Sequence, residues 1–199
     1  MSYVQSEASH VMNTPCTPAD YIAELERQSA QVATLAAGLS ELTLNWQPSP
    51  QSWSIGQCLD HLVLINGMML DAMRASVEEN RDQLKPRQGP IEAQSAFMRW
   101  YLGFSEPPPR RKILAPKKIA PSSRIPAGIV PAFNAAQRRI TAFVEEFGSA
   151  DLSEITYKVG FLPVVWLSVD TGLALIAAHN RRHLWQAEQV KKSAGFPQQ

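Results

Sequence analysis

The chain has 199 residues, of which 45% are hydrophobic and 19% are charged, and its formal net charge is +1. This size suits one well-buried domain, and the near-neutral charge provides no global field that would attract nucleic acid or an anionic membrane. We therefore expect a single globular domain, residues 17–193, that binds neither.

The N-terminal residues, 1–16, are predicted to form a flexible leader. They lack a basic region followed by an apolar one, so no signal peptide is expected, and no apolar run in the sequence reaches the length of a membrane span. The two cysteines, Cys16 and Cys58, are too few for a disulfide framework, although pairing of the two stays open. These features favour a cytoplasmic protein.

The first helix has a clear start signal in residues 17–20, Thr-Pro-Ala-Asp. This sequence combines a capping residue, a proline at the first helical position and an acid in the first turn. Apolar residues then recur at helical spacing until about Ser40. We predict a helix here, followed by a proline-containing connection over residues 42–52.

The second helix is marked by Ser54 and Gln57, which have the Ser-x-x-Gln spacing of a capping box. Its apolar face continues until charges take over at residues 78–81. His61 lies on the flank of this face, where it is either a metal ligand or a boundary histidine bonded to a backbone carbonyl. Cys58, one turn before His61, is expected to be a small buried hydrophobic residue and is left out of any metal site.

A long break, residues 83–130, follows the second helix and is dense in prolines, which long helices do not tolerate. Only a short helix around residues 91–102 is expected there. Structureless loops of this length are rare in compact domains, so we expect a crossover or lid. Its basic cluster, within residues 110–118, lacks interleaved aromatic residues and is interpreted as a solvated loop, not as a nucleic-acid site.

Two more helices are predicted in the C-terminal part. The third begins at Pro131 and ends at Gly148, and the fourth is capped by Ser168 after an extended piece over residues 157–162. Four amphipathic helices predict an all-α fold, a four-helix bundle. The short first connection favours an antiparallel pair, whereas the long proline-rich insertion between the second and third helices allows those two to run parallel.

The fourth helix carries two histidines, His179 and His183, on a largely apolar face. Buried imidazoles need a partner, and two neutral imidazoles one turn apart can share a metal ion. The alternative is two histidines that each find a separate partner. The residues between them, Asn-Arg-Arg, lack the glutamate of a His-Glu-x-x-His motif, which excludes a zinc protease of that type.

Three features together resemble the DinB superfamily, close to its bacillithiol- and mycothiol-dependent transferases. They are Trp53-Ser54, Asp60-His61-Leu62 and His179-x-x-x-His183-Leu184-x-Gln186. The resemblance implies an up-down-down-up bundle, often in a homodimer, in which His61, His179 and His183 hold a divalent metal ion. The residues themselves agree with this, because three imidazoles from two facing helices leave metal positions open, as catalytic sites do.

The expected function is that of a metal-dependent enzyme acting on a small molecule, either a thiol S-transferase or a hydrolase. Zinc or nickel is the favoured ion, with a low-molecular-weight thiol as a candidate cosubstrate. Gln186 and Arg182 are candidates for orienting the substrate, although Gln186 can equally be a packing residue and Arg182 can pair with Glu188 or Asp60. The alternative function is a non-catalytic, stress-associated bundle that binds metal and dimerises, with Trp185 as a contact residue.

Overall fold

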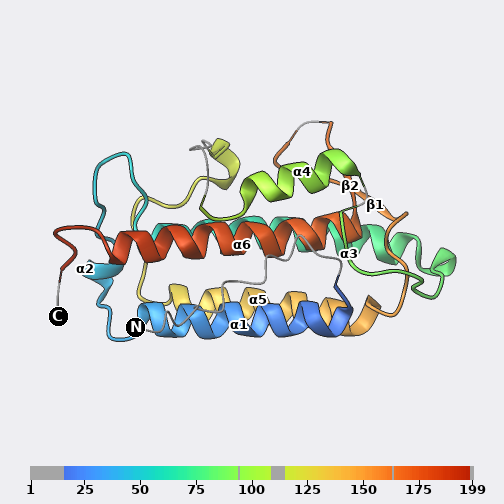
Figure 1. Cartoon of the computed structure of the whole chain (residues 1–199), viewed down its shortest axis with the longest axis horizontal. Coiled ribbons are helices and arrows are strands. Elements are labelled where there is room, and N and C mark those ends of the chain that lie inside the picture. Colours follow the sequence, from blue (N-terminus) through green and yellow to red (C-terminus); the bar gives the residue numbers. More distant parts are fainter. Residues whose placement is uncertain (1–15, 94, 109–114, 163, 198–199) are drawn as a thin grey trace, which may run out of the picture.

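The structure is a computed structural model that describes residues 16–93, 95–108, 115–162 and 164–197. The expected leader lies almost entirely outside these residues. Four long helices dominate the molecule (Figure 1): α1 Pro18–Ala36, α3 Ile55–Glu79, α5 Ile129–Phe147 and α6 Val169–Lys191. The shorter elements are α2 Glu41–Leu44, η1 Arg81–Gln83, α4 Ala96–Ser105, η2 Lys117–Ile119, β1 Thr156–Lys158 and β2 Trp166–Ser168.

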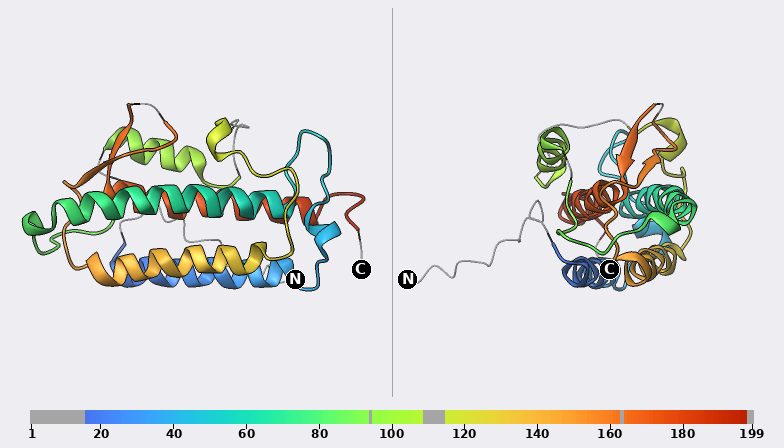
Figure 2. Two further views of the ribbon diagram at one scale, coloured as in Figure 1. Left: turned by 180° about the vertical axis from the view of Figure 1, so that it is seen from behind. Right: turned by 90° about the vertical axis from the view of Figure 1, so that its right-hand side faces the viewer.

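The four long helices form a bundle with up-down-down-up topology. In Figures 1 and 2, α1 and α6 run in one direction, while α3 and α5 run in the other. Helix α3 packs against α5 and α6, and α1 packs against the same two helices. The predicted all-α bundle and its topology are confirmed.

Helix starts follow the capping signals of the sequence. Thr17 and Asp20 form a reciprocal capping box at α1, Ser54 and Gln57 form another at α3, and Ser168 caps α6. Helix α5 starts at Ile129, two residues before the predicted Pro131. The first turn of a helix tolerates proline because its amide groups have no intrahelical acceptor.

The proline-rich connection between α3 and α5 contains η1, α4 and η2. Helix α4 begins at Ala96, later than the predicted residue 91. Ile91 instead forms an isolated antiparallel bridge with Cys16, in which the Ile91 amide donates to the Cys16 carbonyl at 2.8 Å. Ser95 then caps the helix by accepting a hydrogen bond from the Met98 amide.

The expected extended piece over residues 157–162 corresponds to β1, which covers Thr156–Lys158 and pairs antiparallel with β2. The second strand was not predicted, because its residues run directly into the cap of α6. The hairpin lies above the layer formed by α3 and α6, as does α4 (Figure 2).

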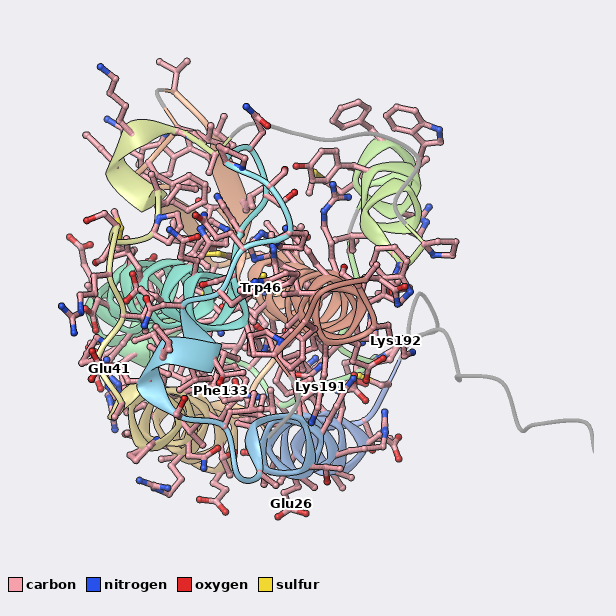
Figure 3. The ribbon with its side chains drawn as sticks, turned by 90° about the vertical axis from the view of Figure 1, so that its left-hand side faces the viewer. Glu26, Glu41, Trp46, Phe133, Lys191 and Lys192 are labelled. Atoms are coloured by element: carbon pink, nitrogen blue, oxygen red, sulfur yellow. The ribbon has the colours of Figure 1, made fainter. Side chains whose placement is uncertain are left out.

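Most of the bundle core is apolar, and a polar layer of amide side chains crosses it. Figure 3 looks along the bundle from the end that carries α2, where Phe133 lies between the helices and is fully buried. Each long helix contributes one amide side chain to the polar layer: Gln28, Asn66, Gln137 and Asn180. Asn180 donates to Gln28 Oε1 at 2.8 Å and to Gln137 Oε1 at 3.2 Å. These bonds fix the rotation of α6 and hence the face on which its histidines lie.

Within the described ranges, no helix combines the length and the apolar character that a membrane crossing requires.

Candidate metal centre

The structure brings the three predicted histidines together. His61 comes from α3, and His179 and His183 come from the helix packed against it, α6. His179 Nε2 lies 3.4 Å from His61 Nε2 and 3.1 Å from His183 Nε2. A tetrahedral ion with metal–nitrogen bonds of 2.0–2.1 Å separates its ligand nitrogens by about 3.3–3.4 Å. These two separations match those of a three-histidine metal site, and the potential ligand atoms of all three histidines lie within 4.8 Å of one another.

The outer nitrogens of two of these histidines are held by acceptors. His61 Nδ1 lies 2.5 Å from the carbonyl oxygen of Ile119 in η2. His183 Nδ1 lies 3.0 Å from Gln186 Oε1, one turn further along α6. Since each oxygen accepts, each Nδ1 carries the proton and each Nε2 turns a lone pair toward the cluster. Such outer bonds orient metal-binding imidazoles.

His179 lies between the other two imidazoles. Its Nε2 faces both of their lone pairs, while its Nδ1 is buried and has no hydrogen-bond partner among the described residues. One proton on Nε2 cannot point at two acceptors with good geometry at once. A divalent cation would engage all three nitrogens together, so this donor set fits such an ion.

The environment keeps the three imidazoles neutral. Burial lowers the pKa of His61, although the bond to Ile119 and the charge of Asp60 oppose this effect. Burial, reinforced by the other two histidines and Arg182, holds the pKa of His179 well below its ordinary value. Burial also lowers the pKa of His183 from 6.5 to about 3. Neutral imidazole is the form that binds metal, so near pH 7 the cluster needs no proton release.

Trp53 packs against the cluster from the loop that leads into α3. Its ring centroid lies 4.8 Å from that of His61 and 5.4 Å from that of His183, over which it is stacked at 25°. The sequence marked Trp53 only as part of a family motif and indicated no contact with the ligands. The contact joins a loop residue to side chains of two helices, α3 and α6.

The two substrate-orienting candidates occupy different positions. Gln186 contacts His183 directly. Arg182 is 8% exposed, and its charge contributes to the low pKa of both His179 and His183. Of the two carboxylates considered as its partners, Asp60 accepts a hydrogen bond from the Ser122 amide and Glu188 accepts one from Gln31.

Cys58 belongs to an apolar cluster that includes Leu59 and Leu62. It is fully buried, and burial raises the pKa of its thiol, so the side chain stays protonated. The cluster of potential metal ligands consists of His61, His179 and His183, without this cysteine. Cys58 therefore behaves as the small hydrophobic residue that was expected.

Comparisons with known proteins identify a family and a fold. The DinB superfamily profile matches residues 24–187, a range that contains all three histidines. Comparison with curated proteins gives no match. Among solved structures, YfiT from Bacillus subtilis, described as a probable metal-dependent hydrolase with an unusual four-helix bundle topology, has the same fold. The TM-score is 0.55 at 12% sequence identity, over 88% of this chain and 86% of YfiT. The profile match spans most of the sequence, and the chain therefore belongs to the DinB superfamily.

Proposed function

We propose that this protein is a metal-dependent enzyme that holds a divalent ion through His61, His179 and His183 and acts on a small molecule. The convergence of three Nε2 atoms carries the proposal, since two of the opposite Nδ1 atoms are tied to acceptors. Two reaction classes fit this site. The described role of YfiT supports hydrolysis, and the resemblance to thiol-dependent transferases supports S-transfer.

The residues of the chain prepare the site in two ways. Ile119 and Gln186 hold the Nδ1 protons of His61 and His183, so that the Nε2 lone pairs face inward. All three ligands are neutral and leave the charge of a dication undiminished. When bound, such an ion lowers the pKa of a water or thiol and polarises a carbonyl or leaving group. Imidazole nitrogens suit zinc and nickel, which are the ions we favour.

Arg182 and Trp53 indicate which class of substrate the site would accept. The buried Arg182 guanidinium adds positive charge beside the ligands, which favours a substrate with an anionic group. The ring of Trp53 provides an apolar wall over His61 and His183. We propose a small anionic molecule with an apolar portion as substrate, and a low-molecular-weight thiol as cosubstrate if the reaction is S-transfer.

Two further parts of the proposal concern the location of the protein and its oligomeric state. Both cysteines are free and buried, which supports a reducing, cytoplasmic location. A homodimer is proposed from the family resemblance alone.

Metal analysis tests the proposal. Purified protein should contain zinc, nickel or another divalent ion at about one per chain, and the triple variant His61→Ala, His179→Ala, His183→Ala should contain none. The matched control is His10→Ala, which changes the one histidine outside the cluster. Ester hydrolysis and thiol-conjugation screens, with and without a chelator, then identify the reaction class. Wild-type protein that takes up no ion would contradict the proposal.

A non-catalytic, stress-associated metal-binding and dimerising bundle is the second candidate. It is favoured by the cover that Trp53 places over two ligands and by the low exposure of His61 and His183, 2% and 7%. Azide added to the Co²⁺-substituted protein discriminates the two functions. A change in the visible spectrum shows an open metal position and favours the enzyme, whereas an unchanged spectrum favours a sealed, structural metal.

A further inference from the structure

A short segment between α4 and α5, residues 117–125, runs along the N-terminal half of α3, and we call it the strap. It begins with η2, which contacts α3. Ile119 is 4% exposed and Ile125 is fully buried, whereas the residues between them are mostly exposed. The two isoleucines belong to different core clusters. The strap is therefore anchored in the core at both ends.

Side chains of α3 bind the middle of the strap. Asp60 Oδ2 accepts a hydrogen bond from the Ser122 amide at 2.8 Å. Gln57 Nε2 donates to the Ser122 carbonyl at 3.2 Å. Asp60 is the residue directly before His61, so the strap is fastened to α3 next to the metal ligand.

The far end of the strap is fastened to the C-terminal cap of α2. Asn45 Nδ2 donates to the Ile125 carbonyl, and Asn45 Oδ1 accepts from the Ile125 amide, both at 2.8 Å. Gly56 in the first turn of α3 makes room for this end. A Cβ atom on Gly56 would lie 3.0 Å from Ile125 Cβ, closer than side chains normally pack.

The strap reaches the metal centre through one carbonyl group. Ile119 O accepts from His61 Nδ1 at 2.5 Å, which selects the tautomer with a free Nε2 lone pair. His61 is the ligand from α3, while the other two come from α6. Its orientation thus depends on a backbone group whose position the strap sets.

We infer that the strap is a positioning element of the metal centre: it holds His61 with Nε2 toward the cluster, so metal affinity depends on contacts as distant as those of Asn45. The effect on affinity rests on the proposed metal site. The tautomer and orientation of His61 do not, because they follow from contacts of the protein alone.

Two variants loosen the strap without changing a ligand or its neighbours. Asn45→Ala removes both bonds to Ile125. Gly56→Ala adds one methyl group where Ile125 packs, and alanine is a better helix former than glycine, so α3 itself is preserved. Asn45→Asp keeps the acceptor for the Ile125 amide and should restore part of the effect. The matched control is Asn80→Ala, which removes a 2.8 Å bond to the Ser76 carbonyl at the other end of α3.

Two measurements decide the inference. Nitrogen-15 NMR of the metal-free protein, with His61 assigned by a His61→Gln variant, reports its tautomer and the exchange of its Nδ1 proton. Chelator competition with Zn²⁺ reports affinity. Asn45→Ala and Gly56→Ala should speed the exchange and weaken Zn²⁺ binding by about tenfold, as loss of outer-shell support commonly does, while Asn80→Ala stays at the wild-type values.

The inference is overturned if both strap variants match Asn80→Ala in exchange and affinity, or if wild-type His61 carries its proton on Nε2. Failure of the proposed function is a separate outcome. If wild-type protein binds no Zn²⁺, the metal site is wrong, and the NMR measurement still decides whether the strap orients His61.

Discussion

Gln186, a candidate for orienting the substrate or for packing, accepts a hydrogen bond from His183 Nδ1 at 3.0 Å. At this position Gln186 orients the imidazole of His183. Gln186→Ala should weaken Zn²⁺ binding by about tenfold, because the imidazole loses its outer acceptor. Gln186→Glu should strengthen binding, since a carboxylate accepts the same proton more strongly. Chelator competition measures both effects.

The control for these variants is Gln189→Ala, on the same helix and half-buried. Equal affinities in Gln186→Ala and Gln189→Ala would show that Gln186 acts only in packing.

The metal-free protein should lose stability in mild acid. The pKa of His183 is about 3 in the folded protein and 6.5 in its ordinary state, so between these values the unfolded chain binds more protons. The contribution of neutral His183 to the free energy of unfolding is therefore complete above pH 6.5 and is lost as the pH falls toward 3. The loss is at most about 1.4 kcal/mol per pH unit for this residue.

Urea denaturation of the chelator-treated protein at several pH values between 7.5 and 5 measures this loss. A His183→Gln variant should show a shallower dependence on pH. A free energy of unfolding that is constant across this range would contradict the burial of neutral imidazoles.

A buried ion pair ties the proline-rich connection to the start of α6. Arg87 donates to both carboxylate oxygens of Asp170 at 2.9 Å, and the two side chains are 10% and 1% exposed. Arg87→Ala should lower the free energy of unfolding by about 3–5 kcal/mol, because it leaves a buried carboxylate without its partner. Chemical denaturation measures the difference.

Arg139→Ala is the matched control, since Arg139 pairs with Asp71 on the surface, where both side chains are more than half exposed. It should cost less than about 1 kcal/mol. Similar losses of unfolding free energy in both variants would mean that burial does not make the Arg87–Asp170 pair more stabilising than an exposed pair.

Trp53 should report metal binding by fluorescence. Its ring lies against His61 and His183, whose charge distribution changes when a cation binds. Zn²⁺ absorbs no visible light, so a change in tryptophan emission during titration reflects the surroundings of the ring. Trp53→Phe should abolish most of this change, while chelator competition shows that affinity is largely kept.

Trp166→Phe serves as the control, because this tryptophan lies in β2 and is 62% exposed. A signal that disappears in Trp166→Phe and persists in Trp53→Phe would place the ion away from the histidine cluster.

The sequence by itself determined most of the bundle and the residues of the candidate site. Helix starts were predictable because capping is local: Thr17 with Asp20 and Ser54 with Gln57 satisfy amide groups within one turn. The histidine pair of α6 was visible because a helix places residues four apart on one face. His61 was added through the family motif, and the metal that all three are expected to bind stays a prediction.

The tertiary structure alone decided how the histidines are held. The acceptor for His61 is the carbonyl of Ile119, 58 positions away along the chain. Since every residue has a backbone carbonyl, the sequence does not indicate which one accepts this bond. The stacking of Trp53 and the second strand of the hairpin could not be predicted for a similar reason. Each depends on a contact between separate segments, and the local sequence pattern of a segment does not specify which other segment it contacts. Local periodicity and capping specify a helix, whereas the tautomer of a ligand depends on which distant group packs beside it.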